Sequence, residues 1–254
     1  MLKNYYDQLS PHYQYIHQDW NLSVQRQAEI LDGIIRQHFG SEAHTLLDAA
    51  CGIGTQCIGL AEKGYHVAAS DISSVSIEEA RSEAKRRKLV IDFEIVDMRQ
   101  VWNHFGRAFD VVIACDNAIP HLLSDEDILQ AFEQFYRCTQ PGGGCIISVR
   151  DYAAMERGGS KLVPRTAHET PDGKIIIFDY WKFDGDFYDF TTYIVEDRGK
   201  ALANTHVIQG GRYYCVSISR LEVLMAQAGY AQVVTLRDGF YQPLLIGSRP
   251  PARG

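Results

Sequence analysis

The clearest chemical pattern in the sequence is a glycine-rich turn, residues 48–54, between a short apolar run and a helical stretch. An acid, Asp48, ends the run, and Gly52 and Gly54 follow it. Glycines in such a turn let the backbone come close to a ligand, because a side chain there would collide with it. Further along, Asp71 ends the next apolar run, where a carboxylate can accept both hydroxyls of a ribose. The pattern predicts a nucleoside-like ligand.

Two other interpretations of this turn compete with a ribose-binding site. A dinucleotide-binding turn expects a third glycine at position 57, and the sequence has Cys57 there. A dinucleotide-binding turn also does not require an acid before the glycines, where this sequence has Asp48. The glycines can instead serve chain geometry alone. Against that alternative, Asp48, Asp71 and Asp97 all fall at the carboxyl edge of the predicted sheet, where open α/β sheets bind ligands.

The elements that must position these residues alternate between strands and helices over residues 45–152, which predicts a parallel sheet wrapped by helices. Short apolar runs predict strands at 45–49, 66–70, 91–96, 110–115 and 145–149, the last after a Pro-Gly-Gly-Gly turn. A one-sided apolar pattern over 128–136 predicts the helix before the fifth strand. A helix at 219–228 and two strands, 232–237 and 241–248, close the chain.

Two further segments differ from this core. Residues 1–44 begin with an aromatic-rich stretch and continue with a predicted helix around 26–38, and we expect them to form a helical lid. Residues 153–216 contain aromatic-rich runs in which apolar and polar side chains alternate. These runs are broken at Asp184-Gly185-Asp186 and at Gly210-Gly211. The pattern predicts antiparallel strands with at least one hairpin. We therefore expect a core of residues 1–152 and 217–254 with an antiparallel cap insertion at 153–216.

Composition narrows the function classes. The 254 residues carry 25 Lys and Arg against 32 Asp and Glu, a net charge of −7, so the broad positive field that long nucleic acids demand is missing. The six cysteines form no CxxC pair, and we expect no metal site. No apolar run approaches the roughly 20 residues of a membrane helix, and the N-terminus lacks a signal-peptide core. We expect a cytoplasmic protein with a small-molecule partner and leave its oligomeric state open.

The motif series resembles the class I S-adenosylmethionine-dependent methyltransferases over roughly residues 25–150. The resemblance rests on residues 48–54, Asp71, Asp97-Met98 and Pro141-Gly142-Gly143. It implies a Rossmann-like, seven-stranded, doubly wound α/β sheet, S-adenosylmethionine as cofactor, S-adenosylhomocysteine as product and no metal. The glycines would pass the methionine moiety, Asp71 would take the ribose hydroxyls, and adenine would lie against Ile72. The implied cofactor residues are Arg26, Asp48, Ala50, Gly52, Gly54, Asp71, Ile72, Asp97, Met98 and Cys115.

A narrower set of motifs is similar to those of the glycine and sarcosine N-methyltransferases: residues 26–29, 116–122 and 149–152. By this resemblance Arg26 pairs with the cofactor carboxylate, and Asn117 and Arg150 hold an amino-acid acceptor. Arg150 is of interest in its own right, since a guanidinium at the ligand-facing strand edge offers a planar fork to a carboxylate. Departures from the family are Asp151 in place of Asn, Pro120 within the loop, and the poorly matching stretch beyond residue 152.

Each acceptor-site candidate has a structural alternative. Arg26 can be a solvated cation on a helix face, and Arg150 can form an ion pair with Asp151 or Asp116. Asn117 can cap the helix that begins near Ser124. His121 can be a hydrogen-bonded core histidine. Tyr13 and the other tyrosines of the first 15 residues can cover the reacting centre or merely seal exposed core.

The expected function is S-adenosylmethionine-dependent N-methylation of a small amine bearing a carboxylate. The alternatives are O- or C-methylation of another small metabolite or natural product, and a non-catalytic S-adenosylmethionine-binding module. Methyl transfer from a sulfonium is an in-line displacement that needs no metal and no covalent intermediate, so the site must align the acceptor and exclude water. The substrate-orienting candidates are Asn117, Arg150, His121 and Tyr13. No residue can be assigned as a general base.

Overall fold

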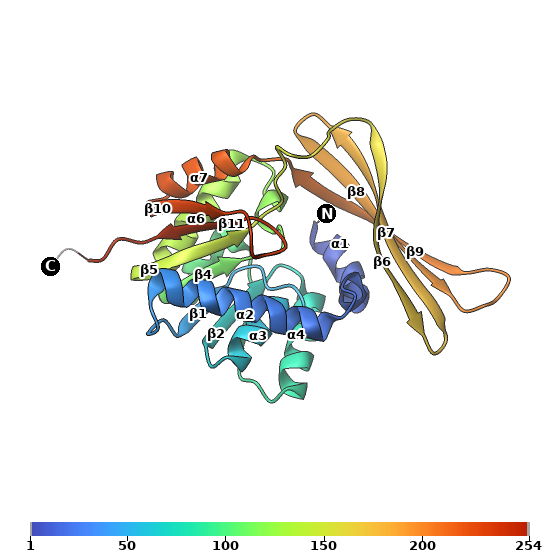
Figure 1. Cartoon of the computed structure of the whole chain (residues 1–254), viewed down its shortest axis with the longest axis horizontal. Helices are drawn as coiled ribbons and strands as arrows, with labels where there is room; N and C mark the ends of the chain where they lie inside the picture. The colour runs from blue at the N-terminus through green and yellow to red at the C-terminus, as the bar shows by residue number, and fades with distance from the viewer. Residues whose placement is uncertain (1, 253–254) are drawn as a thin grey trace.

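The structure, a computed structural model, describes residues 2–252 and contains two sheets (Figure 1). The first has seven strands in the order β10-β11-β5-β4-β1-β2-β3. Strands β1 to β5 are parallel, whereas β11 is antiparallel to both β5 and β10. The strands are β1 (Thr45–Asp48), β2 (His66–Asp71), β3 (Asp92–Ile95), β4 (Phe109–Ala114), β5 (Thr139–Ser148), β10 (Ala231–Leu236) and β11 (Leu244–Ser248). The predicted seven-stranded, doubly wound α/β fold is confirmed.

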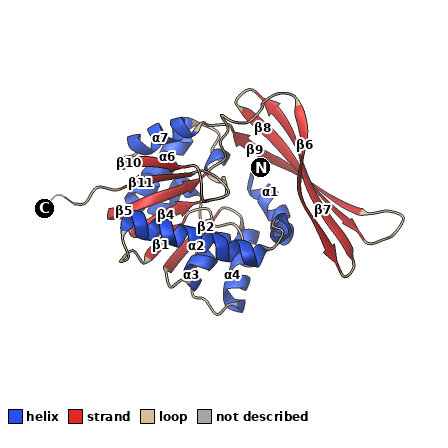
Figure 2. Cartoon of the chain, in the orientation of Figure 1, coloured by secondary structure: helices blue, strands red, loops and turns tan. Residues whose placement is uncertain are grey.

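Helices cover both faces of this sheet, as Figure 2 shows. One face packs against α2 (Trp20–Phe39), α3 (Thr55–Glu62) and α4 (Ser74–Arg86), which bury side chains such as Leu31, Ile58 and Ile77. The other face packs against α5 (Val101–Phe105), α6 (Asp125–Cys138) and α7 (Ile218–Gln227). Because both faces are covered, the central strands are almost wholly apolar, and this is the signal that made them predictable.

The second sheet is an antiparallel meander in the order β6-β7-β8-β9 and lies inside the segment predicted as an antiparallel insertion. Its strands are β6 (Ser160–Thr170), β7 (Gly173–Asp184), β8 (Phe187–Asp197) and β9 (Asn204–Tyr214). Residues 184–186 do form a hairpin turn. The Gly210-Gly211 pair, by contrast, lies within β9. A Cβ at Gly211 would stand 2.3 Å from the Phe190 ring, so only glycine fits at this position. Gly211 thus accommodates an aromatic ring and does not end a strand.

The N-terminal residues form α1 (Leu2–Leu9) and a 3₁₀ helix, η1 (Ser10–Ile16), between the two sheets (Figure 1). Tyr5 is buried there, and its hydroxyl shares a 2.6 Å hydrogen bond with the Thr192 hydroxyl of β8. The first sheet, α1 and the second sheet are thus layered around one hydrophobic cluster. Within residues 2–252, no helix has the length and apolarity to cross a membrane.

Strand β5 begins earlier than the sequence suggested. Its first residues include Pro141 and the three glycines that were expected to form a turn. Gly144 pairs with Ser248 of β11, and a Cβ on it would stand 2.1 Å from the Phe39 ring. Gly144 therefore allows α2 to pack closely on this strand, and the sequence cannot reveal that function of a glycine.

Candidate active site

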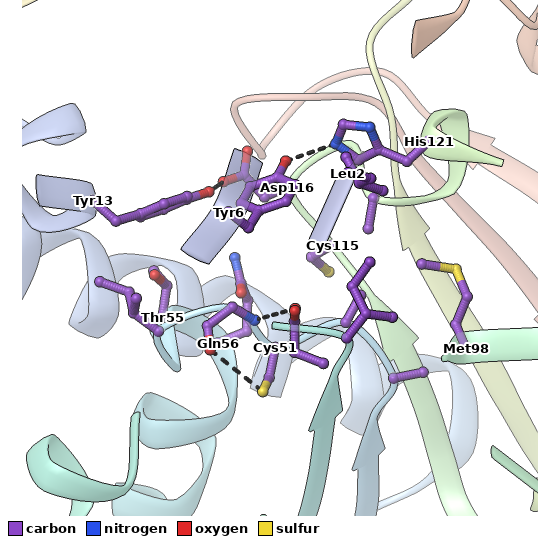
Figure 3. Close-up of a pocket in the computed structure, with 17 residues that line it drawn as sticks. Leu2, Tyr6, Tyr13, Cys51, Thr55, Gln56, Met98, Cys115, Asp116 and His121 are labelled. Carbon is purple, nitrogen blue, oxygen red and sulfur yellow. Dashed lines mark hydrogen bonds between the residues drawn. The ribbon is translucent and has the colours of Figure 1, made fainter. Parts of the chain in front are cut away.

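A cavity of about 650 Å³ opens at the carboxyl ends of β1, β2 and β4 (Figure 3). Its size suits a small organic ligand. The floor is made by the turn after β1 and by the residues that follow β2, and Met98, which opens the 3₁₀ helix η2 (Met98–Gln100), lies at one side. The turn after β4 forms another wall, and α1 and η1 form the roof. The cavity lies where an open α/β sheet binds its ligand.

The two glycines of the turn have different roles. Gly52 lines the cavity at a φ of +52°, and its N–H donates to Asp71 Oδ2 over 2.9 Å. Gly54 precedes α3 at a φ of +98°, where a Cβ would stand 2.6 Å from Ile58 Cδ1. Gly52 therefore exposes backbone to the cavity, whereas Gly54 is required by the packing beneath it.

Asp71 lies at the cavity wall and is held by the backbone. Its Oδ1 accepts the Ser73 N–H at 2.9 Å, and its Oδ2 accepts the Gly52 N–H. Burial raises the pKa of Asp71, and these N–H donors oppose the shift. Each oxygen keeps a lone pair for a ligand hydroxyl, so the fixed carboxylate can accept a pair of them. Ile72 and Met98 add apolar wall beside it.

Six of the predicted cofactor residues line the cavity: Ala50, Gly52, Asp71, Ile72, Met98 and Cys115. Four others lie elsewhere. Asp48 is buried under the turn, where its Oδ1 accepts the Ala50 N–H at 3.3 Å and burial raises its pKa to about 7. Asp97 caps η2 and pairs with Arg99 at 2.6 Å. Gly54 lies behind the wall, and Arg26 is exposed on α2.

Two tyrosines fasten the roof to the turn after β4 (Figure 3). Tyr13 donates its hydroxyl hydrogen to Asp116 Oδ2 over 2.8 Å. Tyr6 and His121 are joined by a 2.6 Å hydrogen bond between the hydroxyl and Nε2. His121 ends the 3₁₀ helix η3 (Ile119–His121), and burial lowers its pKa to about 3. The imidazole is therefore neutral at ordinary pH.

The turn after β4 is strained and firmly anchored. Asp116 and Asn117 have φ values of +56° and +63°, which are uncommon for residues other than glycine. Asn117 is fully buried, and its Oδ1 accepts the Arg150 N–H at 3.0 Å while its Nδ2 donates to the Tyr152 hydroxyl at 2.7 Å. Asn117 thus holds the turn to the residues after β5 and does not line the cavity. Ser124, not Asn117, caps α6.

Arg150 lines a second cavity of about 300 Å³ that shares Tyr6, Tyr13 and Asp116 with the first. Its Nη1 donates to the Tyr188 hydroxyl over 2.7 Å, and the guanidinium lies 5.3 Å from the centre of the Trp181 ring. In the part of the chain that the structure describes, no carboxylate forms an ion pair with it. The proposed structural pairing with Asp151 does not form, since Asp151 pairs with Arg237.

Asp116 and Gln56 line the first cavity, and the sequence analysis did not single them out as site residues. Tyr6 lines it too, and it was among the tyrosines expected either to cover the reacting centre or to seal exposed core. Asp116 could have been found, because it follows β4 just as Asp71 ends β2 and therefore falls at the same sheet edge. Tyr6 follows no predicted strand, so the position of the sheet edge could not place it. Its place over the cavity depends on how α1 packs between the sheets. Gln56 donates to Gln27 at 2.7 Å and so links α3 to α2.

Comparison with known proteins adds three findings. Residues 46–143 match the family model described as "Methyltransferase domain". The glycine/sarcosine N-methyltransferase of Aphanothece halophytica is 31% identical over 143 residues, which cover 56% of this chain and 53% of that protein. The chain thus spans about half the length of the curated relatives it matches.

Two solved structures share the fold over almost the whole chain. The CcbJ methyltransferase of Streptomyces caelestis has a TM-score of 0.78 and 14% identity, and the alignment covers 97% of this chain and 98% of that one. The SAM-bound amino pentose methyltransferase CalS10 of Micromonospora echinaspora has a TM-score of 0.77 and 17% identity, with 94% and 95% covered. Likeness at this level of identity shows the fold.

Proposed function

We propose that this chain, a member of the class I S-adenosylmethionine-dependent methyltransferases, transfers a methyl group from S-adenosylmethionine to a small-molecule acceptor. The observation that carries the proposal is the cavity at the carboxyl edge of the sheet, with bare backbone at Gly52 and the fixed carboxylate of Asp71. That donor set fits the cofactor: a carboxylate suits the ribose hydroxyls, and Ile72 and Met98 offer an apolar surface to a purine.

The proposed acceptor is a small amine that carries a carboxylate, methylated on nitrogen. Arg150 supports this choice, because it lines the adjoining cavity without an ion-pair partner among the described residues. A guanidinium without a partner carboxylate is costly inside a protein, and a ligand carboxylate would satisfy it. The glycine/sarcosine N-methyltransferase relatives support the same class of acceptor.

An amino sugar is the second candidate acceptor. It is favoured by the full-length likeness to the amino pentose methyltransferase and by the aromatic wall of the second cavity, where Phe190 and Tyr213 stack with ring centroids 4.8 Å apart. Aromatic faces commonly pack against apolar faces of ligands. A sugar amine without a carboxylate would leave Arg150 unsatisfied, and for that reason we place this acceptor second.

When bound, S-adenosylmethionine supplies an electrophilic methyl group on its sulfonium. The residues of this chain then position the acceptor and exclude water. Tyr6 and Tyr13 lie over both cavities and hold the roof to the turn after β4. Asn117 fixes the backbone of Arg150 and so orients the guanidinium toward the acceptor. With a pKa near 3, His121 keeps Tyr6 in place as a neutral hydrogen-bond partner and is not suited to store a proton.

Titration calorimetry with S-adenosylmethionine, S-adenosylhomocysteine and NAD tests the cofactor. We expect the two sulfur nucleosides to bind in the micromolar range and NAD to give no heat. Binding of NAD alone, or of none of the three, would contradict the proposal. A screen with methyl-labelled S-adenosylmethionine against glycine, sarcosine and small amino sugars then tests the acceptor. Cofactor binding without transfer to any amine would favour O- or C-methylation or a non-catalytic module instead.

A further inference from the structure

We propose that Asp116 binds the acceptor nitrogen and makes the site selective for amines over hydroxyls. The inference rests on the proposed function and extends it by one residue. Asp116 lines both the cavity assigned to the cofactor and the cavity that contains Arg150, so it lies where the two meet. A methyl group passing from one ligand to the other must cross that junction.

The Asp116 carboxylate is held in position but not neutralised. Its Oδ2 accepts the Tyr13 hydroxyl at 2.8 Å, and within residues 2–252 no Lys, Arg or His forms an ion pair with it. Its own N–H donates to the Ser148 hydroxyl at 2.7 Å, which fixes a backbone at a φ of +56°. Strained backbone of this kind is kept where it orients a functional group.

The charges of the second cavity fit a zwitterion. Arg165 also lines it, but Asp179 neutralises this guanidinium at 2.7 Å. Arg150 and Asp116 therefore remain as one positive and one negative charge without an ion-pair partner in the described chain. An amine with a single carboxylate complements both, with its nitrogen at Asp116 beside the cofactor cavity and its carboxylate at Arg150.

The chemistry of methyl transfer explains the selectivity. The bound ammonium first loses a proton to water. The neutral amine then attacks the methyl carbon, the C–S bond breaks with its electron pair on sulfur, and the new C–N bond leaves a positive nitrogen, which loses a second proton to water. A fixed carboxylate stabilises the charge that develops on nitrogen in the transition state. A hydroxyl acceptor must instead gain negative character before attack, and the same carboxylate opposes it. Asp116 thus favours nitrogen over oxygen.

The test compares Asp116→Asn with the control Asp92→Asn, which removes an exposed carboxylate paired with Arg107 at 2.6 Å. The probes are glycine and sarcosine, together with glycolate, in which a hydroxyl replaces the amine. We expect Asp116→Asn to hold the Kd of S-adenosylhomocysteine within about twofold while kcat/KM for the amine falls roughly 100-fold. The control should match the wild type, and glycolate should not be methylated.

The outcomes separate the two proposals. Failure of the wild type to bind S-adenosylhomocysteine would overturn the proposed function itself. Amine methylation that Asp116→Asn leaves within about threefold of wild type would overturn only the role of Asp116. Methylation of glycolate in place of the amines would overturn the selectivity. Tyr13→Phe gives a second test that leaves position 116 unchanged: it should lower kcat/KM about tenfold with an unchanged cofactor Kd, and full activity would contradict the inference.

Discussion

The Tyr6 hydroxyl donates to Nε2 of His121 over 2.6 Å, and Nδ1 of the same ring donates to the backbone carbonyl of Arg212 at 3.1 Å. The carbonyl can only accept, so the proton must be on Nδ1 and Nε2 must be the acceptor. One neutral imidazole therefore joins α1, the turn after β4 and β9. Both of its nitrogens are hydrogen-bonded, and protonation of Nε2 would place an unpaired charge in a buried site and would reverse the direction of the bond to Tyr6.

This relationship predicts an acid-sensitive fold. Burial lowers the pKa of His121 to about 3 in the folded protein, whereas an unfolded histidine titrates near 6.5. Between these values the unfolded chain binds one more proton, so stability is full above about pH 6.5 and is lost as the pH falls toward 3. From pH 7 to pH 5, we expect this group alone to lower the free energy of unfolding by about 2 kcal/mol.

Urea unfolding of the wild type and of His121→Gln at pH 7, 6 and 5 measures this contribution. The wild type should lose stability more steeply than His121→Gln over that range. His66→Gln, which alters an exposed histidine at the start of β2, should follow the wild type. If the free energy of unfolding falls equally with pH in the wild type and in His121→Gln, the lowered pKa of His121 does not contribute to the acid sensitivity.

The two glycines of the turn should separate binding from stability. Gly54→Ala places a methyl 2.6 Å from Ile58 Cδ1 at a φ of +98°, and we expect it to cost about 1–3 kcal/mol of stability. Gly52→Ala meets no atom within 4 Å at a φ of +52°, so its cost should be about 1 kcal/mol. Because position 52 lines the cavity, the Kd of S-adenosylhomocysteine should rise at least about tenfold in Gly52→Ala.

Thermal unfolding and calorimetry on the same two samples check this pair. If Gly52→Ala binds like the wild type, the glycine serves chain geometry and the cofactor does not approach the backbone at this position. If Gly54→Ala is as stable as the wild type, the contact with Ile58 relaxes without cost.

Asp71→Asn should weaken cofactor binding while the fold persists. The amide keeps one acceptor oxygen for a backbone N–H, but it cannot accept hydrogens at both atoms as the carboxylate does. We expect S-adenosylhomocysteine to bind at least about tenfold more weakly. The melting temperature should fall by only a few degrees, the cost of one backbone N–H that loses its acceptor. An unchanged Kd would exclude the role of Asp71 at the ribose.

Local chemistry decided which site features could be predicted. The turn, Asp71 and Met98 follow strands that the sequence predicts, and the carboxyl edge of a parallel sheet brings them together. Arg150 was predictable for the same reason. Tyr6 lies 115 residues from His121 in sequence, and only the docking of α1 between two sheets brings them together. Gly211 looked like a strand breaker because the Phe190 ring it accommodates belongs to another strand.

Arg150 should determine the carboxylate preference of the acceptor. Its guanidinium lies over the Trp181 ring and forms no ion pair with any carboxylate of the described residues. A ligand carboxylate would therefore be its ion-pair partner. We expect Arg150→Ala to weaken a carboxylate-bearing acceptor by about 2–5 kcal/mol, the range for truncating one member of a buried charged pair, with little change in cofactor affinity. Arg150→Lys should recover part of this loss, because the charge remains while the planar fork is gone.

Kinetics with sarcosine and with methylamine, an amine without a carboxylate, show whether Arg150 binds the acceptor carboxylate or only supports the fold. For Arg150→Ala, KM for sarcosine should rise far more than KM for methylamine, whereas Arg107→Ala, on the surface, should change neither. An equal loss for both amines, accompanied by weaker S-adenosylhomocysteine binding, would mean that Arg150 holds β5 against the second sheet through Tyr188 and Trp181. The unpaired charge would then be structural, and the amino sugar would become the better acceptor candidate.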